Sequence, residues 1–172
     1  MEITEIDSIE LKCLDMEDYQ ELKKAMVSSY QSMSDSYWKE SHIFTLLDKF
    51  KEGQVVLKVN GRLAGCALSI IVDSDLLADN HTYEEITAKY SFDSHSDDGD
   101  ILYGIDIFIL PEYRGMRLGR RLYDYERNFA KSSISKGSYL EVGSRIITSS
   151  KRSSTPRSTS KRSGQKRSRI RY

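Results

Sequence analysis

A basic, glycine-bearing stretch, PEYRGMRLGRR at residues 111–121, has the composition of an anion-binding loop. An apolar run at Ile101–Leu110 precedes it, and a helix-like run at Leu118–Phe129 follows it. The first N–H groups of a helix lack internal partners and lie at the positive end of its dipole, so a phosphate or diphosphate binds well there. Glycine lets a ligand approach the backbone, and arginine adds charge; the arginines are Arg114, Arg117, Arg120 and Arg121. The alternative is an ordinary strand-to-helix turn with a solvated basic face.

Hydrophobic periodicity predicts the elements that position this loop. Alternating apolar residues indicate a strand at Ile9–Cys13, and Asp15 is a favourable N-cap for the helix after it. A second helix is expected from about Ser36 to Phe50. Asn60 and Gly61 tolerate positive φ and predict a hairpin. The remaining expected elements are strands at Gln54–Val59 and Leu63–Val72, a short helix at Tyr83–Tyr90, a loop at Phe92–Asp100 and a central strand at Ile101–Leu110. This order predicts an α+β fold.

Charge divides the chain into two parts. Residues 1–130 carry 14 Lys and Arg against 25 Asp and Glu, whereas residues 131–172 carry 12 against one, Glu141. The second part also holds 13 serines and shows no hydrophobic periodicity, a composition typical of disorder. We therefore expect a domain at 1–134 and a disordered basic tail at 135–172. The tail's charge would suit phosphate binding, but without interleaved aromatic residues a nucleic-acid partner is not expected.

The order of elements and the basic loop resemble the GNAT superfamily of N-acetyltransferases. Their acyl-CoA signature, Q/R-x-x-G-x-G/A, aligns with Arg114–Gly119, with Arg117 at the position of the first motif glycine. An arginine there is unfavourable if positive φ is required. Further strings are similar to one subgroup, in which the domain is fused to a carbon–nitrogen hydrolase domain. These strings are DSYWKE at 35–40, GCALSIIV at 65–72, DNHTYEEIT at 79–87, YGID at 103–106 and RLGRRLY at 117–123.

The resemblance implies a mostly antiparallel sheet flanked by helices, with acetyl-CoA or another acyl-CoA as co-substrate and no metal. The pantetheine would meet the backbone of Ile107, Phe108, Ile109 and Leu110. The diphosphate would be held by the amides of Gly115, Met116, Arg117, Leu118, Gly119 and Arg120, together with Arg114. The acceptor would be an amine of a small molecule or a peptide, attacking the thioester directly with help from a base.

Asp106 is the candidate for that base, because burial in an apolar strand raises the pKa of a carboxyl group. The alternative is an aspartate that only hydrogen-bonds to its neighbours. Glu84 and Glu85 either approach the acceptor or form a solvated helix face. Tyr37 and Trp38 either line an acceptor pocket or pack in the core. The histidines His42 and His81 lack the paired spacing of metal ligands.

The resemblance ends near residue 130, where a fifth strand is expected at about 135–142. The residues Tyr139–Ser149 can be back-translated into codons that, when read one nucleotide out of frame, encode a different peptide. That peptide is similar to the fifth strand and the following loop of the subgroup. This suggests a frameshift or truncation, with the C-terminal strands missing or replaced. Three functions stay open: an N-acyltransferase, a silent acyl-CoA-binding or supporting domain of a hydrolase fusion, and an inactive truncated product. The start of the chain lacks the features of a signal peptide, and Cys13 and Cys66 lack metal or disulfide spacing, so a cytoplasmic location without membrane insertion is expected.

Overall fold

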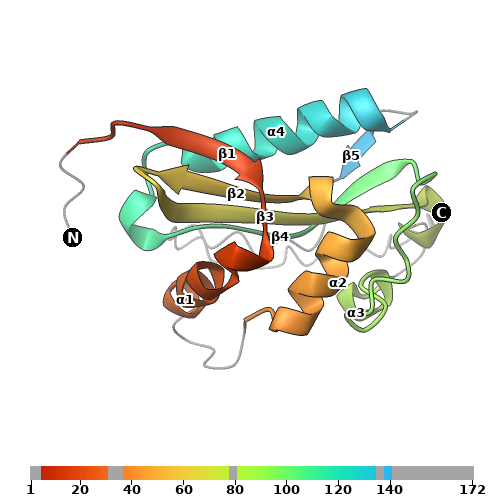
Figure 1. The fold of residues 1–172 in the computed structure, drawn as a ribbon. Coiled ribbons are helices and arrows are strands. Elements are labelled where there is room, and N and C mark those ends of the chain that lie inside the picture. The colour runs from red at the N-terminus through yellow and green to blue at the C-terminus, as the bar shows by residue number, and fades with distance from the viewer. Residues whose placement is uncertain (1–4, 31–36, 78–80, 135–137, 141–172) are drawn as a thin grey trace, which may run out of the picture.

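The computed structural model describes residues 5–30, 37–77, 81–134 and 138–140. One five-stranded sheet has the order β1-β2-β3-β4-β5, with α1 and α2 on one face and α4 on the other (Figure 1). The α+β class with a mostly antiparallel sheet is confirmed. The elements are β1 Ile9–Cys13, the 3-10 turn η1 Met16–Asp18, α1 Tyr19–Ser29, α2 Glu40–Phe50, η2 Lys51–Gly53, β2 Gln54–Val59, β3 Arg62–Val72, η3 Ser74–Leu77, α3 Tyr83–Ile86, β4 Ile101–Ile109, η4 Pro111–Tyr113, α4 Leu118–Ser133 and β5 Ser138–Leu140.

The predicted hairpin joins β2 and β3. Asn60 and Gly61 have φ of 50° and 77°, the left-handed conformation that a tight two-residue turn requires. The Asn60 side chain also accepts hydrogen bonds from the backbone N–H groups of Asp7 and Ser8, at 2.9 and 3.0 Å. The turn therefore fixes the β2–β3 register and also holds the chain just before β1.

Apolar stripes attach the helices to the sheet. In α2 the buried residues Ile43, Leu46 and Phe50 recur at helical spacing. In α4 the apolar residues Leu118, Leu122 and Ala130 are buried on one side, and the charged residue Glu126 is buried between them. The helix continues to Ser133, four residues beyond the predicted end, whereas α3 ends at Ile86 instead of Tyr90. Beyond α3 the chain turns through positive φ at Ala88, Lys89, Tyr90 and Phe92, a conformation that periodicity does not reveal.

A β-bulge interrupts the pairing of β3 with β4. Leu68 pairs with Asp106 and Ser69 pairs with Gly104, so Ile105 is an extra residue in β4. Leu102 lies in the apolar cluster that includes Ala130 of α4. In a regular strand Asp106, four residues later, would face the same side. Instead its carboxylate meets Tyr30 and Trp38, which are on the face covered by α1 and α2.

The fifth strand is short and parallel. Ser138, Tyr139 and Leu140 pair with Ile101, Leu102 and Tyr103 at the start of β4. These three residues lie in the segment that was assigned to the tail, and the domain boundary expected at 134 stays a prediction. The rest of that tail, 141–172, and the frameshift hypothesis lie outside the described residues. No helix in the described ranges is long and apolar enough to cross a membrane.

Candidate active site

The basic loop lies between the end of β4 and the start of α4, as predicted. After η4 the chain turns at Gly115, with φ of 83°, and again at Arg117, with φ of 57°. Residues 115–117 are exposed. Arg117, which stands at the position of a motif glycine, therefore adopts the left-handed conformation in spite of its side chain. A non-glycine residue in this region stores strain on the order of 1–3 kcal/mol.

The N-terminus of α4 carries no compensating group of its own. Arg117 is the N-cap residue, no side chain caps the helix, and the first turn contains no acidic residue. The N–H groups of Leu118, Gly119 and Arg120, the first three residues after the N-cap, have no acceptor within the helix. The positive end of a 16-residue helix dipole is thus combined with unpaired donors and exposed arginines. This arrangement suits an anion.

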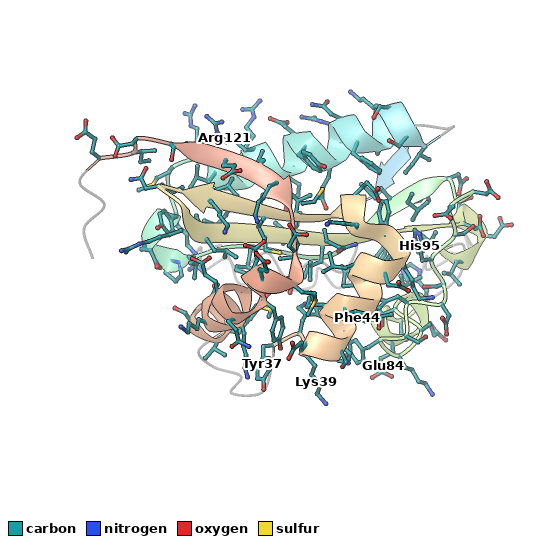
Figure 2. The ribbon with its side chains drawn as sticks, in the orientation of Figure 1. Tyr37, Lys39, Phe44, Glu84, His95 and Arg121 are labelled. Carbon is teal, nitrogen blue, oxygen red and sulfur yellow. The ribbon has the colours of Figure 1, made fainter. Side chains whose placement is uncertain are left out.

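Arg114 differs from the other arginines of the loop. Its Nε donates to the carbonyl oxygen of Ile109 at 3.2 Å, which ties the loop to the end of β4. Its Nη2 is buried and has no hydrogen-bond partner among the described residues. Arg117, Arg120 and Arg121 are exposed, with Arg121 on the first turns of α4 (Figure 2). Arg120 lies 3.8 Å from Asp124 on a side chain that is 76% exposed, so its charge remains available.

Four residues at the end of β4 were predicted to meet the pantetheine through their backbone. Only some of them direct their N–H and carbonyl groups toward the edge of β4 that faces away from β3. The N–H of Leu110 donates to the carbonyl of Ala64 in β3 at 2.9 Å, and pairing alternates along an antiparallel ladder. Phe108, in register with Cys66, therefore also faces β3. The main-chain groups of Phe108 and Leu110 are thus directed toward β3, and their contact with the pantetheine stays a prediction. Ile107 and Ile109 face the other edge, where β5 pairs within the described chain only with residues 101–103.

Asp106 follows the bulge residue Ile105 and directly precedes Ile107, whose backbone faces away from β3. Its carboxylate is 8% exposed and accepts hydrogen bonds from the Tyr30 hydroxyl at 2.7 and 2.8 Å. The Trp38 indole N–H donates to Oδ2 at 3.0 Å. Both partners only donate here, so the geometry fits the ionised carboxylate, which only accepts. The bulge carbonyl of Ile105 accepts from the Tyr83 hydroxyl at 3.3 Å.

Aromatic rings surround this carboxylate. Trp38 contacts Tyr90 and Phe92 from the strained turn after α3, and Tyr30 meets Phe108 edge-on at 6.1 Å. Sequence reasoning left Trp38 between core packing and an acceptor pocket. It missed Tyr30, which the pattern of α1 indicated only as an apolar residue. The signal would have been an aspartate predicted inside a buried strand, which needs donors from other elements.

The other candidates lie apart from Asp106 or are engaged locally. Glu85 caps α3 together with Thr82, and hydrogen bonds from Thr82 lower the pKa of Glu85. Glu84 is exposed and lies at the same end of the molecule as Tyr37 and Lys39 (Figure 2). His42 stacks on Tyr90 at 5.1 Å, and its pKa is lowered by burial and by Lys39. Across the described ranges, no three His, Cys, Asp or Glu side chains gather as a metal site.

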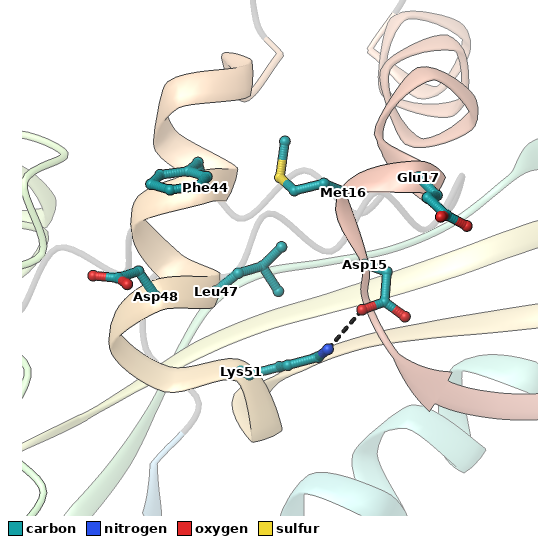
Figure 3. Close-up of a pocket in the computed structure, with 7 residues that line it drawn as sticks. All are labelled: Asp15, Met16, Glu17, Phe44, Leu47, Asp48 and Lys51. Carbon is teal, nitrogen blue, oxygen red and sulfur yellow. Dashed lines mark hydrogen bonds and ion pairs between the residues drawn. The ribbon is translucent and has the colours of Figure 1, made fainter.

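Two surface hollows lie away from the loop. One lies between η1 and α2 and is lined by Asp15, Met16, Glu17, Phe44, Leu47, Asp48 and Lys51; Lys51 Nζ is 2.6 Å from Asp15 Oδ1 (Figure 3). The other is lined by acidic residues and by the loop at 93–100. Neither contains Asp106 or a residue of the loop at 114–120.

The sequence matches the model of the acetyltransferase (GNAT) family over residues 19–144. The chain belongs to this family. Two proteins of Bacillus subtilis (strain 168) are related to it in sequence. "Probable hydrolase YhcX" is 33% identical over 109 residues, which cover 63% of this chain and 21% of that protein. "Uncharacterized N-acetyltransferase YkwB" is 31% identical over 85 residues, 49% of this chain and 38% of that protein. The chain thus spans well under half the length of either relative.

Two solved structures share the fold of this GNAT family member. The loading GNATL domain of CurA from Lyngbya majuscula superimposes with a TM-score of 0.65 at 22% identity, covering 79% of this chain and 65% of that chain. The GphF GNAT-like decarboxylase, in complex with isobutyryl-CoA, superimposes with a TM-score of 0.64 at 13% identity, covering 77% of this chain and 65% of that chain. At these identities the likeness concerns the fold alone.

Proposed function

We propose that the protein is an acyl-CoA-dependent N-acyltransferase, which transfers an acetyl or other acyl group to an amine of a small molecule or a peptide. The observation that carries the proposal is the N-terminus of α4, which no side chain caps and which follows the part of β4 that pairs with no strand other than β3 among the described residues. The amides from Gly115 to Arg120 would hold the diphosphate of coenzyme A, with Arg117 and Arg120 beside it. The orphan Nη2 of Arg114 fits such a ligand, since buried donors are normally paired.

The pantetheine would follow the edge of β4 from the loop back toward the bulge, bonding to the backbone of Ile107 and Ile109. This path leads to Asp106, whose carboxylate we propose as the group that finally receives the amine's proton. A negative charge beside the thioester attracts an amine and repels an acyl group that carries a carboxylate. Asp106 therefore supports amine acylation rather than the decarboxylation named for one of the structural neighbours. The cysteines Cys13 and Cys66 are free, which is compatible with the cytoplasmic location that we propose for the reaction.

Binding and turnover test the proposal separately. Isothermal titration with acetyl-CoA should give a dissociation constant that rises with salt and rises further in Arg114→Ala and Arg120→Ala. Arg127→Ala is the matched control, because Arg127 is an exposed arginine of the same helix that lies outside the loop and pairs with Asp124. Free CoA should then appear with acetyl-CoA and a panel of primary amines, and malonyl-CoA should not lose carbon dioxide. If the wild type does not bind acetyl-CoA, the proposal fails.

A catalytically silent acyl-CoA-binding or supporting domain is the second candidate. It is favoured by the relationship to YhcX, a protein named as a probable hydrolase, in which the matched region makes up 21% of the length. A fused carbon–nitrogen hydrolase domain would be the partner in that case. Acetyl-CoA binding without CoA release for any amine would support this reading over the acyltransferase.

A further inference from the structure

We propose that His95 is a pH-sensitive latch, which holds the loop at 92–100 against β3 while its imidazole is neutral and releases the loop when the ring binds a proton. Release of the loop slows acyl transfer in acid, because the loop supports Trp38 beside Asp106. The latch itself does not depend on the proposed function, whereas its effect on turnover rests on that function.

The end of β3 extends beyond its partner β2 and needs other hydrogen-bond partners. β2 pairs with β3 only as far as Leu68, whereas β3 continues to Val72. At Ile71 the loop takes the place of β2. The Ile71 N–H donates to His95 Nδ1 at 3.1 Å, and the Ile71 carbonyl accepts from the Ser96 N–H at 2.9 Å. Because a buried N–H group needs an acceptor, the imidazole closes this edge of the sheet.

The hydrogen bonds of the imidazole define its protonation state. Since Nδ1 accepts from a backbone N–H, the proton of the neutral ring is on Nε2, which faces Asp97 Oδ1 at 3.2 Å. A second proton binds at Nδ1 and turns this acceptor into a donor that faces the N–H of Ile71. Protonation of His95 and the closed loop therefore exclude each other.

Solvent reaches the ring through the hollow that His95 lines. The side chain is 7% exposed, borders the hollow of about 780 Å³ beside the start of β4, and stacks on Phe50 of α2 at 5.0 Å (Figure 2). Carboxylates dominate the surroundings: Asp93, Asp97, Asp98 and Asp100 in the loop, Asp73 and Asp75 beyond the end of β3, with Lys49 of α2 paired to Asp93. This negative charge attracts a proton to the released ring. In the closed loop the pull of Asp97 is weak, because its side chain is 91% exposed.

The loop connects the latch to the buried carboxylate of Asp106. Phe92 is fully buried, and its ring centroid lies 5.9 Å from that of Trp38, whose indole N–H donates to Asp106. The backbone N–H of His95 donates to the Phe92 carbonyl at 3.0 Å, so movement of His95 loosens Phe92. The turn at 88–92 holds four non-glycine residues at positive φ, and relief of this strain favours release.

Hydrogen exchange of the Ile71 amide, measured by NMR on the full chain, tests the latch directly. An imidazole in water titrates near a pH of about 6.5, so the closed loop is fully stable above this pH and is lost progressively below it. A proton that only the released loop binds raises the opening constant about tenfold between about pH 7.5 and about pH 5.5. The exchange rate, corrected for its intrinsic pH dependence, should rise by this factor, and the ring nitrogen shifts at neutral pH should show the proton on Nε2. A neutral ring with its proton on Nδ1, or an exchange rate that does not rise, overturns the latch.

His95→Asn is the matched variant, since the asparagine Oδ1 takes the position of Nδ1 and accepts the same hydrogen bond without titrating. Its Ile71 exchange should change by less than about twofold over the same range of pH. His81→Gln alters a histidine outside the hollow and should keep the full rise. A full rise in folded His95→Asn, or its loss in His81→Gln, overturns the role of His95. If His95→Asn does not fold, the measurements on the wild type decide.

The effect on turnover has its own test. The kcat of amine-dependent CoA release should fall more steeply in acid for the wild type than for His95→Asn, and equal pH profiles overturn the link between the latch and turnover. A wild type whose Ile71 amide opens in acid, but which releases no CoA with any amine, overturns the proposed acyl transfer and supports the latch.

Discussion

Gly65 of β3 lies directly opposite Ile109 of β4, with no space between them for a side chain. A Cβ atom at Gly65 would lie 2.4 Å from Ile109 Cδ1 and 2.8 Å from the carbonyl oxygen of Phe108. Leu122 Cδ1 of α4 is 3.5 Å from the same point. The glycine therefore lets the end of β4 and the start of α4 pack closely, which sets the position of the basic loop between them.

Gly65→Ala should consequently destabilise the protein and weaken coenzyme binding together. The added methyl group must displace the backbone of β4 or the side chains of Ile109 and Leu122, at a cost of about 1–3 kcal/mol. Urea denaturation and acetyl-CoA titration measure the two effects. Gly104→Ala is the control, because nothing lies within 4 Å of a Cβ at Gly104. Equal stability of the two alanine variants would refute this packing argument.

Replacing Arg117 by glycine should separate backbone strain from charge. Glycine adopts the observed φ of 57° without steric cost, so the unfolding midpoint of Arg117→Gly should rise. The variant also lacks one guanidinium group, so its affinity for acetyl-CoA should fall, and the loss should shrink at high salt. The expected increase in the free energy of unfolding of Arg117→Gly is about 0.5–1 kcal/mol.

Gly115 is the other residue of the loop with a left-handed backbone, and there we expect Gly115→Ala to lower the stability of the protein. Gly115 has φ of 83° and empty space around its Cβ position, so any cost of the alanine comes from the backbone alone. Thermal unfolding should show Gly115→Ala below the wild type and Arg117→Gly above it. A fall in the midpoint of Arg117→Gly would mean that the arginine's contacts outweigh its strain.

The sequence was sufficient to predict the elements whose signals are local. The hairpin at Asn60 and Gly61, the bounds of β2 and the start of α4 follow from periodicity and turn chemistry alone. The bulge at Ile105 has no local signature, because it depends on the register of β4 against β3. Without it, Asp106 is expected on the α4 face, and Tyr30 has no visible role.

The candidate site also has features that local sequence predicts and features that depend on tertiary pairing. A glycine-bearing basic loop before a helix is readable from residue types, so the place of the loop between β4 and α4 was predicted correctly. The pairing direction of the β4 backbone is a tertiary property, so the sequence could not separate Phe108 and Leu110, whose backbone faces β3, from Ile107 and Ile109, whose backbone faces the other edge. The short β5 falls where the resemblance places a fifth strand, but its three residues carry too little pattern of their own to distinguish them from the basic tail.

Neighbouring residues of α2 should respond very differently to truncation. Ile43 is fully buried, whereas Phe44 is 61% exposed and lines the hollow between α2 and η1 (Figure 3). Ile43→Ala should cost about 2–5 kcal/mol, because it removes core contacts and leaves a cavity. Phe44→Ala should change stability by less than about 0.5 kcal/mol. Chemical denaturation checks both, and a large loss for Phe44→Ala would show that the hollow beside η1 is filled in solution.

The buried carboxylate of Asp18 should make the stability of the protein fall at low pH. Lys12 and Lys58 each approach it at 2.8 Å. Burial raises the pKa of Asp18, but the hydrogen bonds from the two lysines outweigh burial, and the net shift is downward from 3.8. Asp18 therefore contributes stability above the pKa of the unfolded chain, and this contribution is lost as the pH falls through the lower pKa of the folded state. The pKa of Lys58 is raised by its hydrogen bond to Asp18, so the contribution of Lys58 is complete at neutral pH and is lost only in strong base.

Asp18→Asn should accordingly be less stable than the wild type at neutral pH, by about 1–3 kcal/mol, because two lysines lose their shared acceptor. The difference should narrow in urea titrations carried out at progressively lower pH, as the wild-type carboxylate takes up its proton. Asp93→Asn is the control. Hydrogen bonds from Lys49 and Ser91 also lower the pKa of Asp93, but its side chain is 73% exposed, so solvent screens the pair and stability should hardly change. A difference between Asp18→Asn and wild type that stays constant with pH would show that the asparagine disturbs packing rather than charge.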